Sequence, residues 1–175
     1  DLLLERRNGE GATVAGITIN PKLQYKDNLG FQLGLTLQQS NYETPVQWSE
    51  TVENTSNRFF RTPNNYGFYV MTWDATKNFT LNLSGVYTGS MIAQHYAGYI
   101  AEDVLETTPT FFENNVKVDY TFKVKADFNV ILSGGIQNYT NAYQKDFDLG
   151  PDRDSAYIYG PGRPRTYFLG MSLKF

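Results

Sequence analysis

The stretch Phe31-Gln32-Leu33-Gly34-Leu35-Thr36-Leu37-Gln38 alternates between apolar residues and polar or small ones. Successive side chains of a β-strand point to opposite faces of the sheet, so this period of two predicts a strand with one apolar and one polar face. Residues 79–88 repeat the pattern, with Phe, Leu, Leu, Gly and Tyr set against Thr, Asn, Ser, Val and Thr. Together the two stretches indicate a sheet of amphipathic strands.

The same pattern, followed outward in both directions, gives seven strand candidates arranged in hairpins. They lie at about residues 15–25, 31–38, 66–74, 79–88, 116–122, 128–136 and 167–175. The first should be interrupted at Pro21, because proline cannot donate a hydrogen bond to the strand ladder. The stretch 66–74 is apolar on both faces, so its facing stays open. We therefore predict an all-β, antiparallel fold.

The connections between these strands alternate in length. Short turns near residues 27, 76 and 125 alternate with segments of about 24 residues, at roughly 42–65, 90–112 and 140–164. Because successive strands are antiparallel, the long segments all fall at one end of the sheet and the tight turns at the other. Loops of this length are uncommon inside compact domains. Outer-membrane barrels combine short periplasmic turns with long extracellular loops, which accounts for the pattern.

Composition is compatible with a membrane β-barrel and excludes several other classes. Only 19% of residues are charged, and 13 Tyr, 12 Phe and 15 Gly favour strands and turns. No run of about 18 apolar residues occurs, which excludes a membrane-spanning helix, but a barrel strand needs only about ten alternating residues. The net charge of -3, with scattered basic residues, argues against nucleic acid as a partner. The absence of Cys excludes disulfides and thiolate metal sites.

A seven-stranded soluble sandwich would show the same period of two, since its inner faces are equally apolar. Three features favour a barrel: strands of about ten residues rather than the usual five or six, long loops gathered at one end, and Phe175 in phase with an apolar face. We therefore expect an outer wall facing hydrocarbon and a wet interior. The outer wall should carry Leu33, Leu35, Leu83, Val118, Leu132 and Leu173, and the interior Gln32, Asn82 and Asp119.

Residues 160–175 resemble the end of TonB-dependent outer-membrane receptors. A Pro164-Arg165-Thr166-Tyr167 core is followed by alternating residues to Phe175, and the acidic stretch 146–154 precedes it. Residues 8–17 are similar to a strand start in the C-terminal third of these receptors. In that family the last strand carries the signal read by the barrel-assembly machinery, and Phe168 stands where a polar residue is usual. The residues that match the signal are Tyr167, Gly170, Met171, Leu173 and Phe175.

The resemblance implies a barrel of about 22 strands filled by an N-terminal plug, with residues 1–175 as the C-terminal portion of the barrel. The implied function is import of a scarce nutrient (siderophore, cobalamin or oligosaccharide) by loop capture and plug displacement. The implied location is the outer membrane of a Gram-negative bacterium. The implied partners are the rest of the barrel and its plug, the TonB energy-transducing protein, the barrel-assembly machinery, outer-membrane lipid and a surface lipoprotein.

Two other functions stay open on the sequence: a secreted β-sandwich that binds glycan or protein, and an outer-membrane barrel that acts as an enzyme or adhesin. No cofactor is expected, and an enzyme is not expected because the sequence lacks a nucleophile elbow, a phosphate-binding glycine loop and a histidine-based triad. The first ten residues lack the zones of a signal peptide, so we expect the chain to begin inside a loop.

Candidate ligand contacts are the aromatic residues and the single histidine of the long loops, because aromatic rings stack on planar or sugar-like ligands. Packing of the loops against one another would use the same side chains, and a solvated loop position is the plainer interpretation of the histidine. These residues are Trp48, Phe59, Phe60, His95, Tyr96, Tyr99, Tyr157 and Tyr159.

Four carboxylates in the last long loop form a weak calcium candidate, since calcium prefers oxygen ligands. They are Asp146, Asp148, Asp152 and Asp154. Their spacing is not that of an EF-hand, and Arg153, Arg163 and Arg165 are close enough in sequence to neutralise them. We therefore favour a salt-bridged loop over a metal site.

Overall fold

A computed structural model describes residues 9–53 and 55–175, so the expectation for the start of the chain falls largely on residues 1–8, which lie outside the described part. The described residues form strands, turns and loops. No helix among them is long and apolar enough to cross a membrane. The strands are β1 (Ala12–Ile19), β2 (Lys22–Tyr25), β3 (Leu29–Gln47), β4 (Thr55–Arg58), β5 (Asn65–Asp74), β6 (Phe79–Thr88), β7 (Ile92–His95), β8 (Val104–Thr107), β9 (Phe111–Lys125), β10 (Phe128–Gln137) and β11 (Thr166–Lys174).

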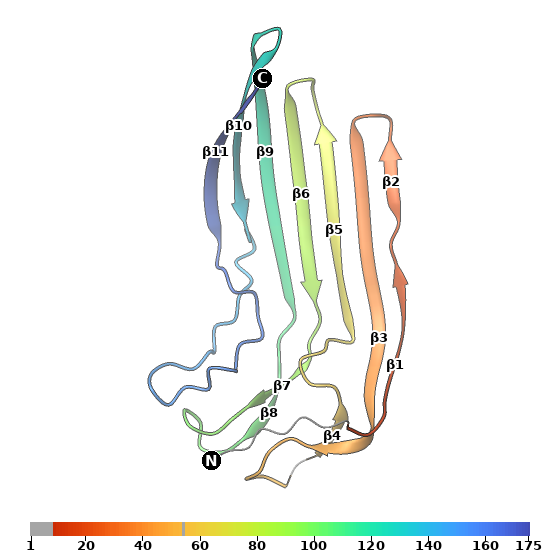
Figure 1. The fold of residues 1–175 in the computed structure, drawn as a ribbon, viewed down its shortest axis with the longest axis vertical. Helices are drawn as coiled ribbons and strands as arrows, with labels where there is room; N and C mark the ends of the chain where they lie inside the picture. Colours follow the sequence, from red (N-terminus) through yellow and green to blue (C-terminus); the bar gives the residue numbers. More distant parts are fainter. Residues whose placement is uncertain (1–8, 54) are drawn as a thin grey trace.

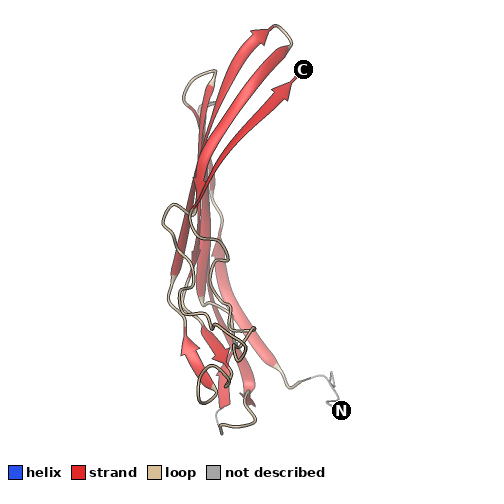
Figure 2. Ribbon diagram, turned by 90° about the vertical axis from the view of Figure 1, so that its left-hand side faces the viewer, coloured by secondary structure: helices blue, strands red, loops and turns tan. Residues whose placement is uncertain are grey.

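The long strands form one antiparallel sheet in the order β1-β3-β5-β6-β9-β10-β11, and β2 and β4 pair with the two ends of β3. The predicted first strand is β1 and β2, separated at Asn20 and Pro21. Figure 1 shows the strands side by side in a single layer, and Figure 2 shows this layer edge-on as a curved wall. Among the described residues, no second layer covers either face of the wall, which contradicts the sandwich alternative.

The register of the strands assigns the side chains to faces. One row across the sheet pairs Phe31, Met71, Leu83, Val116, Ile136 and Tyr167, and the next row on the other face pairs Thr72, Asn82, Lys117 and Gly135. All six residues predicted for the outer wall share the apolar face, and Gln32, Asn82 and Asp119 share the opposite face. The register also settles β5: Tyr69, Met71 and Trp73 lie on the apolar face, Phe68 and Val70 on the polar one.

A chain of polar contacts crosses the polar face through four strands. Thr72 Oγ1 donates to Asn82 Oδ1 at 3.0 Å, and Asn82 Nδ2 donates to Asp119 Oδ2 at 3.2 Å. Lys117 Nζ pairs with Asp119 Oδ1 at 3.0 Å. The Ser133 hydroxyl on β10 donates to the same carboxylate. A charged, hydrogen-bonded row of this kind suits a watery interior and would be costly against lipid.

The predicted loop boundaries were partly wrong. β3 continues to Gln47, β9 begins at Phe111, and the segment 90–112 contains the β7–β8 hairpin, so each of the first two long loops contains strands of its own. Beyond Gln38 the residues of β3 no longer alternate between apolar and polar side chains. The sequence therefore does not reveal this part of the strand. The last short turn is also tighter than expected, because β9 runs to Lys125 and a bulge follows at Phe128.

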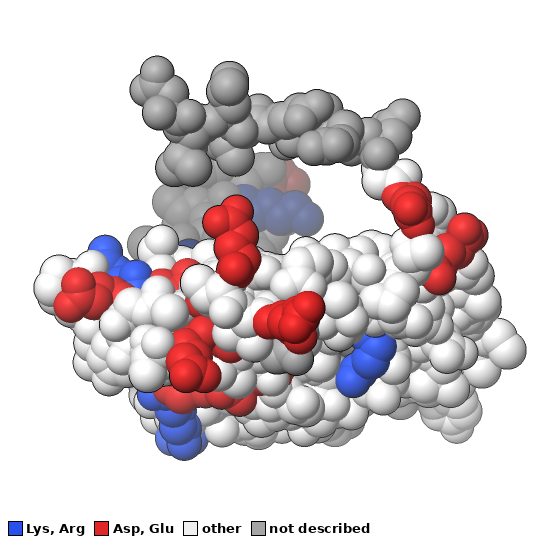
Figure 3. Space-filling view, turned by 90° about the horizontal axis from the view of Figure 1, so that it is seen from below, with Lys and Arg blue, Asp and Glu red and all other residues white. Residues whose placement is uncertain are grey.

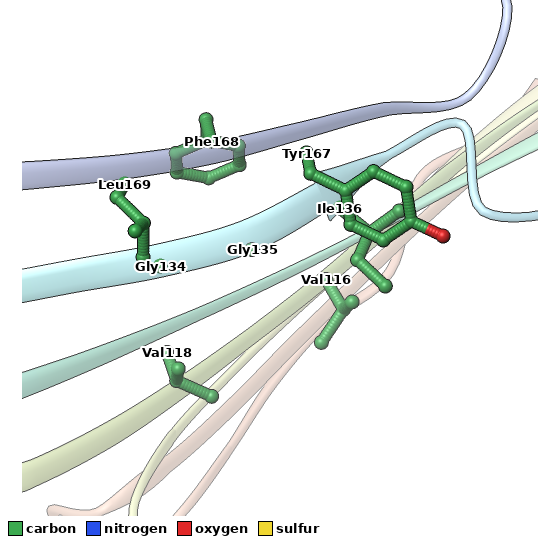
Figure 4. A pocket seen from close by; sticks show the side chains of 8 residues that line it. All are labelled: Val116, Val118, Gly134, Gly135, Ile136, Tyr167, Phe168 and Leu169. Carbon is green, nitrogen blue, oxygen red and sulfur yellow. The ribbon is translucent and has the colours of Figure 1, made fainter.

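The apolar face contains a shallow groove where β10 carries two consecutive glycines, Gly134 and Gly135. Val116, Val118, Ile136, Tyr167 and Leu169 surround it (Figure 4). On the other side of the sheet the Phe168 ring lies over Gly135: a Cβ at Gly135 would come within 2.7 Å of that ring and 2.2 Å of the Val116 carbonyl oxygen. The aromatic ring fills the space left by the glycine, which explains why Phe168 stands where the resemblance predicts a polar residue.

We expect Gly135→Ala to destabilise the sheet and Gly134→Ala to be tolerated. The added methyl at 135 meets backbone, which cannot move without disturbing the β9–β10 pairing, at a cost of about 1–3 kcal/mol. A Cβ at Gly134 has as its nearest neighbour the flexible end of Leu169, 3.2 Å away. Denaturant titration of the folded full-length protein in lipid measures both variants. Equal loss at the two positions would contradict the geometry.

Candidate functional site

Among the described residues, the buried apolar side chains lie at the long-loop end of the sheet. The buried apolar residues are Trp48, Met91, Ile92, Ala93, Phe111 and Tyr157, all in the loops or at the first residue of β9. We call three segments the outer loops: residues 48–53 and 55–64 form the first, residues 89–110 the second and residues 138–165 the third. Together they form the loop cap. In Figure 1 they gather at the end opposite the short turns. The loop cap is therefore an ordered structure.

His95, at the end of β7, ties the second loop to the third. Its Nε2–H donates to the Asp148 carboxylate, with both oxygens at 3.0 Å. Its ring stacks on Tyr157 with centroids 3.7 Å apart and planes 6° from parallel. Burial of Asp148 acts to raise its pKa, but hydrogen bonds from Asp154 N–H and His95 outweigh burial and hold the pKa below its usual value. His95 is thus buried, whereas the sequence favoured a solvated loop position.

Asp146 binds two tyrosine hydroxyls of the third loop. Tyr159 Oη donates to Asp146 Oδ1 at 2.6 Å, and Tyr157 Oη lies 3.4 Å from Oδ2. Burial and the neighbouring Asp146 carboxylate raise the pKa of Tyr157 to about 12, and burial together with the Asp146 hydrogen bond raises that of Tyr159. Gln144 closes the turn by donating to Tyr157 O at 3.0 Å and accepting from Tyr159 N–H at 2.9 Å.

Asp103, in the second loop, holds the start of the first. Its Oδ2 accepts from Ser49 Oγ at 2.6 Å and Thr51 Oγ1 at 2.9 Å, and its Oδ1 accepts from Ala97 N–H at 2.7 Å. The hydrogen bond from Ser49, followed by that from Ala97, lowers the pKa of Asp103 against the opposing effect of burial. The carboxylate form is therefore the one that joins the two loops.

Arg61 connects all three loops. Its backbone sits at a φ of 54°, and its N–H donates to Ile92 O at 2.8 Å. Its guanidinium donates to Ala156 O at 2.7 Å, to Ile158 O at 3.0 Å and, more weakly, to Gln94 O at 3.4 Å. One side chain of the first loop thus holds backbone of both other loops.

The other predicted ligand contacts divide into packed and exposed residues. The ring centroids of Trp48 and Tyr96 are 6.0 Å apart, and the Tyr96 hydroxyl donates to Trp48 O. Phe59 and Phe60 both pack near the Tyr42 ring of β3. Tyr99, at the tip of the second loop, is 56% exposed. Loop packing therefore occupies most of these aromatic residues, and Tyr99 is the one most open to solvent.

The four aspartates do not converge on a common point. Asp146 binds tyrosine hydroxyls, Asp148 binds His95, and Asp154 accepts from Tyr96 N–H at 3.0 Å. Within residues 9–53 and 55–175, no three His, Asp or Glu side chains are placed to hold a metal ion. The favoured salt bridges are not formed either: Arg153 donates to Gly150 O, and in the described part of the chain no arginine pairs with these carboxylates.

Sequence reasoning missed Arg61, Asp103, Gln144 and Asn138. Asn138 is 1% exposed and adopts a φ of 49° where β10 ends. Its Nδ2 donates to Ala142 O at 2.9 Å and Arg163 O at 2.8 Å, which brings the two ends of the third loop together. Asparagine tolerates a positive φ better than most residues, so an Asn two residues after the predicted strand 128–136 was the available signal.

Acidification should loosen the loop cap. Because the folded-state pKa of Asp103 is lowered, its contribution to stability is present above the unfolded value of 3.8 and is lost as pH falls through the lower folded value. Asp148 acts in the same direction. Amide hydrogen exchange of the first and second loops, compared at about pH 6 and pH 3 after correction for intrinsic rates, should show faster opening at the lower pH.

Asp103→Asn should open the same loops already at neutral pH and reduce their further response to acid. The exposed Asp152→Asn provides the matched control and should behave as the unmodified protein does. Acid-independent loop exchange in the unmodified protein would contradict this assignment of the Asp103 carboxylate.

Most of the chain matches solved receptor structures. It is similar to the ferric-catecholate import receptor Fiu from K12 E. coli, with 20% identity, a TM-score of 0.64 and coverage of 93% of this chain and 21% of Fiu. It is similar to the siderophore receptor PiuA from Acinetobacter baumannii, with 15% identity, a TM-score of 0.62 and coverage of 93% and 22%. This chain has the fold of an outer-membrane receptor barrel.

The barrel is not closed within these residues, and the chain spans about a fifth of the length of either receptor. No protein-family model matches the chain, and no curated protein matches it by sequence. Viewed from the loop cap, this chain shows carboxylates scattered over its surface and fewer basic residues (Figure 3). The cap offers hydrogen-bonding groups, exposed aromatic rings and apolar surface, which suit ligand binding.

Proposed function

We propose that this chain is the C-terminal barrel portion of a TonB-dependent outer-membrane receptor that imports a scarce nutrient. The observation that carries the proposal is the amphipathic single-layer sheet with a packed loop cap at one end. An apolar face left open over its whole length suits hydrocarbon, and a cap at the outer end suits capture of a ligand from outside. Transport, unlike catalysis, needs no reacting side chains, and both similar structures are receptors.

A ferric siderophore is the nutrient that the two receptor names favour, and cobalamin and oligosaccharide are the alternatives. We propose that the exposed rings of Tyr99 and Tyr96 and the half-buried ring of Tyr159 contact the ligand. Packing of the cap that carries them would be the role of Trp48, Phe59, Phe60, His95 and Tyr157. These rings lie at the end of the sheet that a ligand from outside would reach first. Aromatic rings there can stack on planar groups of the ligand.

The partners follow from the same proposal. The polar row from Thr72 to Ser133 faces the interior, where a plug would lie, and the TonB protein would act on that plug. Tyr167, Met171, Leu173 and Phe175 lie on the apolar face and Gly170 on the opposite one. We propose these residues as the signal for the barrel-assembly machinery and, for the four apolar ones, as lipid contacts. Phe175 stacks on Phe128 at 5.1 Å, near the short-turn end. A surface lipoprotein would meet the loop cap.

Uptake assays test the function. The full-length protein, expressed in cells that lack their own receptors, should import one of three labelled probes: a ferric catecholate complex, cobalamin or a maltooligosaccharide. Import should disappear when the tonB gene is deleted. Tyr99→Ala should reduce binding of the imported probe about tenfold, whereas Tyr25→Ala at the short-turn end should not. Uptake that persists without TonB, or no uptake of any probe, would refute the proposal.

A further inference from the structure

The third outer loop contains an apolar hollow that nothing described so far fills. Its volume is about 860 Å³. The apolar part of its lining comprises Phe147, Leu149, Tyr157, Ile158, Pro161 and Pro164, and the polar part includes Asp148, Arg153 and Asp154. Phe147, Leu149 and Ile158 are 48%, 64% and 63% exposed. They lie beyond the end of the sheet, in the water-facing part of the proposed receptor, so hydrocarbon cannot cover them. An apolar surface of this kind in water marks a contact with another group.

Neighbouring outer loops of this protein bind one another. The first loop is held to the second by Ser49 and Asp103, the second to the third by His95 and Asp148, and the first to the third by Arg61. Each contact involves a side chain buried or half-buried at the junction. Contacts between loops therefore run across the whole cap and reach the third loop, which contains the hollow.

The far side of the third loop lies next to the open edge of the sheet. β11 pairs with β10 and has no other strand partner among the described residues. In Figure 1 the tip of the third loop projects past β11, away from β7 and β8. A barrel in a membrane leaves no strand edge unpaired. Because β11 runs from the loop cap to the short-turn end, an antiparallel partner would end at the loop cap and carry a loop beside the hollow.

We propose that the hollow is a socket for apolar side chains of that adjoining loop, a segment of the same polypeptide outside residues 1–175. The inference rests on the proposed barrel. It is supported by continuity with the contacts between the described loops and by the length of the similar receptors, of which this chain spans about a fifth. The socket then closes the ring of outer loops, so that the third loop is held on both sides.

Photocrosslinking from the hollow tests the socket. The full-length protein in outer membranes would carry p-benzoylphenylalanine in place of Ile158, and cross-linked peptides would be identified by mass spectrometry after irradiation. We expect Ile158 to join a peptide of the same polypeptide from outside residues 1–175. The same group in place of Val104, an exposed residue of the second loop, should not reach that peptide. Cross-links to lipid, to another protein or only within residues 1–175, or none, would overturn the proposal.

A pair of substitutions gives a second readout. Leu149→Asp with Ile158→Asp should raise the rate of protease cleavage in the third loop about tenfold, because a charged socket rejects the adjoining loop. Val104→Asp should leave that rate unchanged. Nutrient uptake separates the two proposals: uptake by TonB without the cross-link overturns the socket alone, whereas the cross-link without uptake overturns import alone. An unchanged cleavage rate in the double variant would count against the socket.

Discussion

Leu83→Arg is expected to prevent the protein from folding stably in a membrane. Leu83 lies near the middle of β6, in the apolar row with Met71 and Val116. If that row faces lipid, arginine there places a charge close to the bilayer midplane, at a cost of about 2–4 kcal/mol. The full-length protein is refolded into lipid vesicles, and the electrophoretic mobility of the unheated sample measures how much of it is folded. The ratio of folded to unfolded protein should fall about 30-fold or more.

Ser84→Arg is the matched control, because the adjacent residue faces the polar side, in a row with Val70 and Asn115. A charge on that face avoids hydrocarbon, and we expect a change within about 0.5 kcal/mol. The contrast between two neighbouring positions tests the facing of the whole sheet. Equal effects at both positions, or a larger loss at Ser84, would show that the apolar face does not meet hydrocarbon, and the receptor proposal would fail with it.

The strands and their facing could be predicted from the sequence because a sheet with one apolar and one polar face imposes a period of two. Between Phe31 and Gln38 successive residues lie alternately on the apolar and the polar face, and their side chains alternate in the same way. β5 shows the limit of this reasoning. Its residues Phe68 and Val70 are apolar although they lie on the polar face, since Phe68 covers Gly34 of the neighbouring strand. Only the register between strands distinguishes such a ring from one on the apolar face.

The loop cap could not be predicted in the same way, because its contacts join residues far apart in sequence without any period. Asp103 and Ser49 are 54 residues apart, and His95 and Asp148 are 53 apart. The candidate residues were sought as ligand contacts, and His95, Trp48 and Tyr157 proved to be buried packing residues. Arginine in a loop gave no signal either, since a guanidinium bound to carbonyl oxygens needs no acidic residue nearby in sequence.

Arg61→Ala is expected to open all three outer loops together while leaving the sheet intact. Hydrogen bonds that involve a charged group contribute about 1.5–3 kcal/mol each, and Arg61 makes two short ones to the third loop. A loss of roughly 3 kcal/mol in the local stability of the cap corresponds to about a 100-fold increase in the open population. Amide hydrogen exchange of the full-length protein should show this increase in all three loops and none in β6 or β9.

Arg58→Ala separates this linkage from a general effect of removing charge. Arg58 lies three residues earlier, at the end of β4, and is exposed, and its guanidinium makes no hydrogen bond within the described residues. Its replacement should leave exchange in the second and third loops unchanged. If Arg61→Ala accelerates exchange in the first loop alone, the loops are separate bodies. Concerted opening would instead mean that a ligand bound to any one loop stabilises the other two, because the same side chain holds them all.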